Sequence, residues 1–149
     1  MPEVSQPPRR PPTAIRHFTE LIVWQKSHRV ALEVFRLPKA FPPEERYALT
    51  DQVRRSSRAI GAKIAEAWGK RRYEAAFVAK LVDADAEAHE TEHWLINACA
   101  HGYCTEAQVA VIRALLLEVG RMLGQHDERT RHLPHQAPSL SMQVLTSDL

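Results

Sequence analysis

The sequence predicts an all-α protein, an up-down-up-down antiparallel four-helix bundle with a disordered N-terminal arm and C-terminal tail. None of the 10 prolines lies between Glu44 and Leu133, so this span can be helical apart from turns. Within it, apolar residues recur at spacings of three and four, as on the buried face of a helix. No segment alternates with the period of two that a half-buried strand requires. Four amphipathic helices with short connections favour the bundle.

The bundle is expected to span residues 18–133, with a different kind of chain on either side. Residues 1–17 combine five prolines with Arg9, Arg10 and Arg16, which predicts a basic, Pro-rich, disordered arm. Residues 134–149 are expected to form a flexible tail, whose apolar side chains could still dock on the bundle. These side chains are Leu140, Met142, Val144 and Leu145.

The first two helices are expected over about 19–37 and 44–68. Pro38 ends the first helix, and the second follows Pro42-Pro43 with acidic residues in its first turn, which suit the positive end of the helix dipole. The predicted buried stripe of the first helix is Leu21, Trp24, Ala31 and Phe35. That of the second is Leu49, Val53, Ser57, Ile60, Ile64 and Trp68.

The third and fourth helices are expected over about 72–101 and 105–131. The third carries the most regular pattern, spaced 4-3-4-3-4-3, which is a heptad seam typical of helices packed at shallow angles. Its members are Phe77, Leu81, Ala84, Ala88, Thr91, Leu95 and Ala98. Thr105 and Gln108 form a capping box at the start of the fourth helix. Its predicted stripe is Val109, Ile112, Leu116, Val119 and Leu123.

Composition excludes several classes of protein. With 149 residues, 44% of them hydrophobic and 26% charged, the chain is neither disordered throughout nor collagen-like. Cys99 and Cys104 are its only cysteines, too few for a disulfide framework, and we expect reduced thiols in a cytoplasmic protein. No apolar stretch approaches the roughly 18–20 residues that span a bilayer, so no membrane partner is expected.

The formal net charge of +2 conceals a strongly dipolar distribution. Residues 46–72 hold eight basic side chains against Asp51 and Glu66, whereas residues 83–92 hold five acids and no lysine or arginine. We therefore predict a basic surface on the second helix that contacts phosphates. Its candidate residues are Arg54, Arg55, Arg58, Lys63, Lys70, Arg71 and Arg72.

Two interpretations of this surface remain open. It binds structured RNA or DNA through phosphate contacts, to which the basic arm adds salt-dependent affinity. Alternatively, its basic side chains pair with the acidic third helix of the same or a neighbouring subunit, in a protein-interaction scaffold without nucleic acid. No aromatic residues interleave with the arginines, so a platform for stacking single-stranded bases is not predicted.

One motif suggests an enzyme, and its context argues against that function. His89-Glu90-Thr91-Glu92-His93 matches the H-E-x-x-H pattern of zinc hydrolases, in which two histidines bind the metal and the glutamate is the general base. The heptad that buries Ala88 and Thr91 places both histidines on the outside, and no third ligand is evident. A zinc hydrolase is therefore the least favoured function, and we expect neither catalysis nor a cofactor.

Several segments together resemble one family. Trp24-Gln25-Lys26-Ser27-His28 and Glu45-Arg46-Tyr47-Ala48-Leu49 resemble the 23S rRNA intervening-sequence proteins. Ile60-Gly61-Ala62-Lys63-Ile64-Ala65-Glu66-Ala67 resembles their I-G-A-N-I-x-E-A segment, with Lys63 in place of the usual Asn. Glu87-Ala88, Glu90-Thr91 and Trp94-Leu95 resemble the third-helix pattern E-A-x-E-T-x-x-W-L. The resemblance covers residues 18 to about 125.

This resemblance implies a small homo-oligomeric four-helix bundle, for which pentameric barrels are known, without an established enzymatic activity. Similar bundles include the accessory variability determinant of diversity-generating retroelements, a pentamer that binds nucleic acid and a reverse transcriptase. The resemblance therefore implies a homo-oligomer, with RNA, DNA or a reverse transcriptase as further partners. A ring of subunits would repeat the basic helix and make its contacts multivalent.

Overall fold

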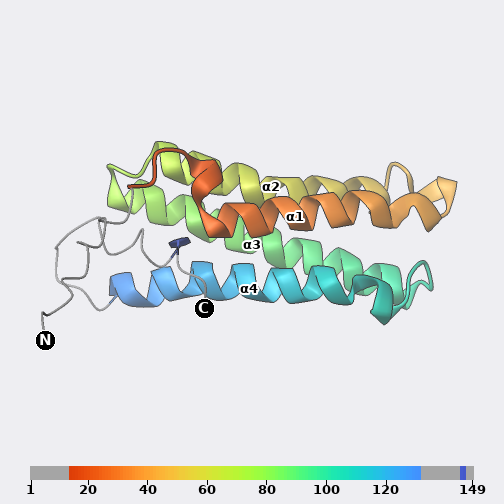
Figure 1. The fold of residues 1–149 in the computed structure, drawn as a ribbon. Helices are drawn as coiled ribbons and strands as arrows, with labels where there is room; N and C mark the ends of the chain where they lie inside the picture. Colours follow the sequence, from red (N-terminus) through yellow and green to blue (C-terminus); the bar gives the residue numbers. More distant parts are fainter. Residues whose placement is uncertain (1–13, 132–144, 147–149) are drawn as a thin grey trace, which may run out of the picture.

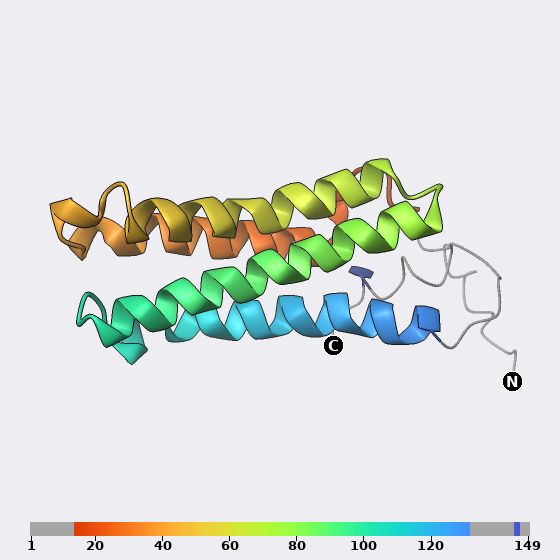
Figure 2. The ribbon, with the colours of Figure 1, turned by 180° about the vertical axis from the view of Figure 1, so that it is seen from behind.

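The computed structural model describes residues 14–131 and 145–146, with side chains for 14–124 and 145–146. Its helices are α1 (Ile22–Arg36), α2 (Leu49–Gly69), α3 (Glu74–Ala100) and α4 (Glu106–Arg131). Figures 1 and 2 show α1 and α3 running in one direction along the bundle, with α2 and α4 running in the other. The predicted all-α, antiparallel four-helix architecture is confirmed. No helix among the described residues is both long enough and apolar enough to cross a membrane.

The core is built from the stripes predicted for α2, α3 and α4. All seven members of the α3 heptad are buried, and they are the only buried residues of that helix. The predicted stripe of α2 is also buried, together with Thr50, Ser56 and Ala67. In α4 the predicted stripe is joined by Leu115 and Met122. The three- and four-residue spacing therefore identified the inward face of these three helices.

The predicted stripe of α1 was wrong for most of its members. The buried residues of this helix are Val23, Ser27, Val30 and Val34, again spaced 4-3-4. Leu21 just before the helix is buried as predicted, whereas Phe35 is 46% exposed. Trp24 and Ala31 lie half-buried at the flank of the stripe, beside α2. The small Ser27 belongs to the core because its hydroxyl donates to the Val23 carbonyl oxygen at 2.7 Å, which satisfies the buried polar atom.

Short 3-10 turns replace the helix ends expected at 19, 37 and 44. They span Phe18–Glu20, Leu37–Ala40 and Pro43–Glu45. The last of these delays the start of α2 to Leu49, whose N–H donates to Glu45 Oε2 at 3.2 Å. The Glu45 side chain thus satisfies one of the otherwise unpaired N–H groups at the start of α2.

The connection from α3 to α4 is a Schellman turn centred on Gly102. Gly102 has a φ of +75°, and its N–H donates to the Cys99 carbonyl oxygen at 3.0 Å. The Tyr103 N–H donates to the Ala98 carbonyl oxygen, also at 3.0 Å, which completes the motif. The predicted capping box follows, because Thr105 N–H donates to Gln108 Oε1 at 2.8 Å and Gln108 N–H to Thr105 Oγ1 at 3.3 Å.

Tyr103 ties this turn to the α1–α2 connection at the same end of the bundle. Its hydroxyl donates to Glu45 Oε1 at 2.8 Å, and its ring lies 5.6 Å from that of Phe41. This hydrogen bond lowers the pKa of the Glu45 carboxyl, with a smaller contribution from the Leu49 N–H. The same bond raises the pKa of the Tyr103 phenol. One side-chain pair thus links the two helical hairpins.

Because of these two pKa shifts, Tyr103→Phe is expected to destabilise the protein only over a defined pH range. The lowered pKa of Glu45 gives a stabilisation that is complete above its ordinary value of 4.5 and is lost as pH falls through the folded-state value. The raised pKa of Tyr103 gives a second stabilisation. It is complete below the ordinary tyrosine pKa of 10.0 and is lost as pH rises through the folded-state value. Thermal unfolding from pH 3 to 11 should show the largest difference from the unsubstituted protein between these limits. Tyr73→Phe, at an exposed tyrosine, is the control, and a pH-independent difference would contradict the assignment.

The two terminal predictions lie mostly outside the described residues. The predicted arm over 1–17 is described only from residue 14, where Ile15 and Phe18 pack against the core. Of the predicted tail over 134–149, the structure describes Leu145 and Thr146. Leu145 is fully buried in the core, so at this position the docked alternative applies. Figures 1 and 2 place this short segment between α3 and α4.

Candidate nucleic-acid interface

The predicted basic residues divide into groups along α2. Arg54 and Arg58 lie on the side of the helix that faces α1. The Arg54 guanidinium lies 4.8 Å from the centre of the Phe35 ring, and its Nη2 donates to the Phe35 carbonyl oxygen at 2.9 Å. The guanidinium of Arg58 lies 6.0 Å from the same ring. Both arginines therefore pack on an exposed aromatic side chain of α1, a contact worth about 0.5–1 kcal/mol at such sites.

Arg55, between these two in sequence, lies on the outer surface of α2. Its Nη2 donates to Gln52 Oε1 at 2.6 Å, which is a neutral partner. Its side chain is exposed. Arg58 is exposed as well, whereas Arg54 is half-buried, so Arg55 and Arg58 are the arginines of this group that a phosphate can reach.

Lys63 lies further along α2, toward α3, and its charge is partly neutralised. Its Nζ is 3.6 Å from Glu66 Oε2, and the same oxygen lies 3.0 Å from Lys80 Nζ of α3. The hydrogen bond from Lys80 is the main reason that the pKa of Glu66 is lowered, with Lys63 contributing less. Lys63 thus belongs to a small surface ion network and is a weaker candidate for phosphate contact than its sequence context suggested.

Lys70, Arg71 and Arg72 form the turn between α2 and α3. Arg71 folds back on the end of α2, where its Nη1 donates to the Trp68 carbonyl oxygen at 2.9 Å and its guanidinium lies 4.2 Å from the Trp68 ring. Lys70 and Arg72 are exposed, and neither side chain forms a hydrogen bond or ion pair with any residue that the structure describes. Two cations of this turn are therefore open to solvent.

The seven residues do not form one continuous patch. Arg58 and Lys70 are separated by twelve positions, which is about 18 Å along a helix axis. One group, Arg54, Arg55 and Arg58, lies in the first half of α2, the other lies at the α2–α3 turn, and Lys63 lies between the two groups. This spacing suits contacts to separate phosphates along a nucleic-acid strand or groove, rather than to one phosphate.

Exposed aromatic residues accompany both groups, which the sequence did not predict. Tyr73 is 73% exposed directly after Arg72, and Phe35 reaches the first group from α1. A tyrosine next to three cations in a predicted turn was the available signal for Tyr73. For Phe35 the sequence contained no such signal. Its contact with Arg54 joins α1 to α2 and depends on how these two helices pack. Tyr73 follows the arginines of this turn and does not interleave with them, so the expectation that a stacking platform for single-stranded bases is absent stays a prediction.

Among the described residues, the acidic side chains of α3 form no ion pair with the basic side chains of α2. Between described residues, the ion pair that joins the two helices links Glu66 of α2 to Lys80 of α3, the reverse of the expected polarity. Glu87 of α3 carries a raised pKa because of its burial and the nearby Glu90, which the charges of Lys63 and Arg55 offset in part. Among the described residues, the acids of α3 therefore leave most of the positive charge on the outer surface of α2 without an ion-pair partner.

The zinc-hydrolase motif lies on the outer surface of α3, as its heptad position predicted. His89 Nδ1 donates to the Asp85 carbonyl oxygen at 2.8 Å, and Glu90 Oε1 accepts the Trp94 Nε1–H at 3.2 Å. His93 Nε2 lies 3.2 Å from Asn97 Nδ2. Each side chain contacts a residue one turn away on its own helix. In the part of the chain with described side chains, no three His, Cys, Asp or Glu residues are arranged to hold a metal ion.

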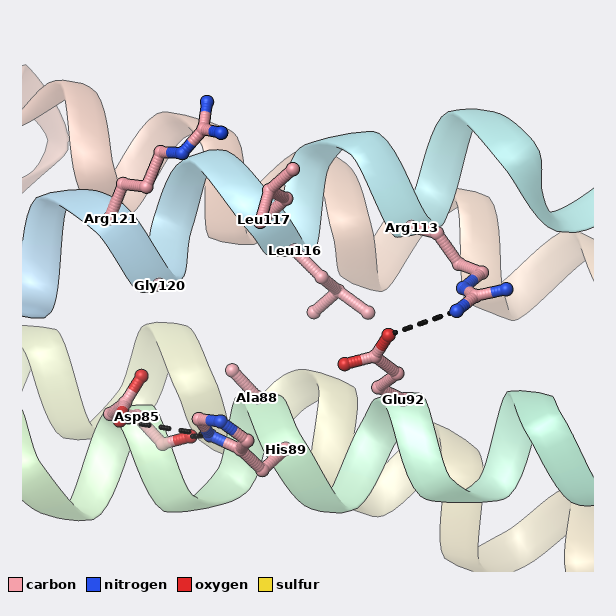
Figure 3. A pocket seen from close by; sticks show the side chains of 9 residues that line it. All are labelled: Asp85, Ala88, His89, Glu92, Arg113, Leu116, Leu117, Gly120 and Arg121. Carbon is pink, nitrogen blue, oxygen red and sulfur yellow. Dashed lines mark hydrogen bonds and ion pairs between the residues drawn. The ribbon is translucent and has the colours of Figure 1, made fainter.

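His89 also lines a shallow groove of about 320 Å³ between α3 and α4 (Figure 3). The small residues Ala88 and Gly120 open the groove. Arg113 reaches across it to Glu92, with Nη2 3.3 Å from Oε1, and also pairs with Glu106 at 3.2 Å. The groove thus carries a mixed-charge rim whose ions largely neutralise one another, in contrast to the outer surface of α2.

The comparisons with known proteins agree with this architecture. The family model "23S rRNA-intervening sequence protein" matches residues 19–125. The chain is also similar to a protein of unknown function from the S23 ribosomal protein family of Bacteroides thetaiotaomicron, with 33% identity and a TM-score of 0.62. That match covers 68% of this chain and 94% of the other. None of the curated proteins compared matches this chain.

The family match covers α1, α2, α3 and most of α4, and it includes both groups of cations on and beside α2. It also contains the residues on which the sequence resemblance was based, from Trp24 to Leu95. Both the fold and the sequence pattern therefore lead to the same assignment. The chain belongs to the 23S rRNA-intervening sequence protein family.

Proposed function

We propose that this protein is a non-enzymatic, homo-oligomeric bundle that binds structured RNA or DNA through phosphate contacts from α2 and the α2–α3 turn. The observation that carries the proposal is a set of exposed cations that form no ion pair with a described residue, Arg55, Lys70 and Arg72. Their backbone lies in a helix and the turn that follows it, so phosphate binding orders only the side chains and not the chain that carries them. An accessory role beside a nucleic-acid enzyme such as a reverse transcriptase fits the same surface.

Phosphate contact rather than base reading would dominate such binding. Arginine presents a planar fork of N–H donors that matches phosphate oxygens, and lysine adds a point charge. Neither contact distinguishes one sequence from another, so affinity should depend steeply on salt and weakly on sequence. The family name refers to 23S rRNA, which supports a structured RNA as the first ligand to test.

The homo-oligomeric part of the proposal is supported by the family resemblance and by apolar surface on α1. Leu32 and Phe35 are large, exposed side chains beside a groove of about 290 Å³ between α1 and α2. Trp24, Ala31 and Gly61 also line the groove. A second copy of the chain seated there would cover this surface and repeat the cations around the assembly, which would raise affinity through multivalency.

The test compares two double variants that remove equal charge from different faces. Arg55→Ala with Arg72→Ala removes exposed cations of the proposed interface, whereas Arg29→Ala with Arg121→Ala removes exposed cations of α1 and α4. Binding to a structured RNA and to a DNA duplex is measured over a salt series. Each lost phosphate contact should reduce the slope of log K against log salt by about 0.9, so the first variant should lose about 2 and the control close to nothing.

Three results would contradict the proposal. The unsubstituted protein could fail to bind either nucleic acid at low salt, or the interface variant could keep the full slope. Equal losses in both double variants would show that overall charge, and not this surface, determines binding. Sedimentation of every variant checks that the oligomer is unchanged.

A second candidate function, a protein-interaction scaffold without nucleic acid, is favoured by the contacts of Arg54 and Arg58. Both pack on Phe35 beside the α1–α2 groove, where a second subunit would bury them. Arg54→Ala with Arg58→Ala should then shift the oligomer toward smaller species. If that variant dissociates and the unsubstituted protein binds no nucleic acid, the scaffold is the function.

A further inference from the structure

The two cysteines of the chain meet at the α3–α4 turn. Cys99 lies in the last turn of α3 and Cys104 just before α4, and their Sγ atoms are 3.5 Å apart. The Schellman turn at Gly102 reverses the chain between them and brings the two side chains to the same side. A disulfide would require the sulfurs to approach by about 1.5 Å further, to the bond length of about 2.05 Å.

The two thiols differ in exposure and therefore in reactivity. Cys104 is buried in the core, whereas Cys99 is partly exposed. Burial and the hydrogen bond with Cys99 raise the pKa of Cys104 to about 12. Cys104 therefore keeps its proton, and the two sulfurs share a hydrogen bond. Because thiol–disulfide exchange needs a thiolate that a reagent can reach, Cys99 is the nucleophile of the pair.

We propose that Cys99 and Cys104 form a reversible dithiol–disulfide pair that is oxidised by low-molecular-weight disulfides such as glutathione disulfide. The proposal rests on the contact between the sulfurs, the unequal access to them and the turn that holds them together. It is independent of the nucleic-acid surface, since neither cysteine belongs to α2 or to the α2–α3 turn. The structure describes both cysteines as free, as the sequence predicts, and the proposal adds that this reduced pair can be oxidised.

The reaction proceeds in two exchange steps. The Cys99 thiolate attacks one sulfur of glutathione disulfide, whose S–S bond breaks to give a Cys99–glutathione mixed disulfide and one glutathione thiolate. Cys104 then loses its proton to solvent or to the released thiolate, attacks the Cys99 sulfur and expels the second glutathione. The two cysteine thiols lose two electrons and two protons in total, and glutathione disulfide becomes two glutathione thiols.

The position of Cys104 favours the second step. In the mixed disulfide Cys99 is no longer a thiol, so its contribution to the raised pKa of Cys104 is lost, whereas burial, the largest cause, remains. The attacking sulfur is already in contact with its target. The product closes a loop of only six residues, from Cys99 to Cys104, around Gly102 and Tyr103.

The test measures the redox equilibrium of the full chain in glutathione buffers. After equilibration and acid quenching, free thiols are alkylated under denaturing conditions with N-ethylmaleimide, and the intact mass is recorded. The oxidised protein should carry no maleimide label, no glutathione adduct and no interchain bond. The folded chain should form this disulfide at a ratio of [GSH]²/[GSSG] about tenfold higher than the same chain in urea, a difference of about 30 mV.

Two single variants separate the roles of the cysteines. Cys104→Ala should accumulate the mixed disulfide at Cys99, because the thiol that resolves it is missing. Cys99→Ser should remain unmodified while folded, because Cys104 is buried. The proposal is overturned if the unsubstituted protein accumulates a glutathione adduct or an interchain dimer, or if folding gives no advantage over the chain in urea. That last comparison needs no variant, so it decides the question even if a substitution prevents folding.

Discussion

Replacing Leu95 by alanine is expected to lower the free energy of unfolding by about 3–5 kcal/mol, because this leucine of the α3 heptad has a fully buried side chain. The loss combines the favourable transfer free energy of the deleted methyl and methine groups with the cost of the cavity left between α3 and the helices packed against it. At about 3 °C per kcal/mol for a chain of this size, the midpoint of thermal unfolding should fall by roughly 10 °C. Urea and thermal unfolding followed by circular dichroism measure both quantities.

The matched control is Ile96→Ala, one residue along the same helix. Ile96 is 51% exposed, so a comparable truncation leaves no cavity and should change stability by about 0.5 kcal/mol or less. The pair tests which face of α3 is inward, since a shift of the heptad by one residue would exchange the two effects. A loss at Ile96 equal to that at Leu95 would mean that the outer face of α3 is buried in the assembly.

The α3 heptad could be predicted because its inward positions are all apolar or small and follow an unbroken 4-3-4-3-4-3 spacing, although the outer face also holds the apolar Val82 and Ile96. On α1 two adjacent stripes are apolar. The prediction followed the stripe that contains the aromatic residues Trp24 and Phe35, but the other stripe is the buried one. The core uses the narrow Val23, Ser27, Val30 and Val34, which let the helices approach closely, while Phe35 is displaced outward and covered by Arg54. Only the packing of α1 against α2 determines this choice, and the sequence of α1 alone does not contain it.

The candidate interface was predictable as a charge excess on α2 but not as a set of available cations. Counting residues treats Lys63, Arg71 and Arg72 alike. In the structure, Glu66 pairs with Lys63 and the Trp68 ring holds Arg71, while Arg72 stays open to solvent. These differences follow from side-chain directions at a helix end and from the reach of Lys80 across to α2. The proposed interface is therefore smaller and more divided than the sequence indicated.

The same reasoning applies to the cysteines. A spacing of five residues, Cys99 to Cys104, is compatible with sulfurs far apart on a continuous helix or in contact across a turn. Gly102 decides between these, because its positive φ ends α3 and reverses the chain. Glycine at this position was a recognisable signal for the helix end, yet the contact between the sulfurs depended on where α4 begins.

Leu145→Ala is expected to destabilise the protein by about 2–4 kcal/mol, although the residue lies only four positions from the end of the chain. Its side chain is fully buried and belongs to the same core cluster as the residues of α3 and α4. Truncation would remove that burial and leave a cavity in the bundle. Equilibrium unfolding in urea measures the loss.

Leu117→Ala makes the same chemical change at a leucine of α4 that is 57% exposed, and it should cost about 0.5 kcal/mol or less. Leu145→Met, which nearly conserves volume, should cost less than about 1.5 kcal/mol. If Leu145→Ala were no more costly than Leu117→Ala, docking of this segment would contribute nothing and the four helices would be a complete folding unit. The expected result means the opposite: the core predicted from four helical stripes is closed by a fifth segment, whose single leucine contributes as much as a residue within a helix.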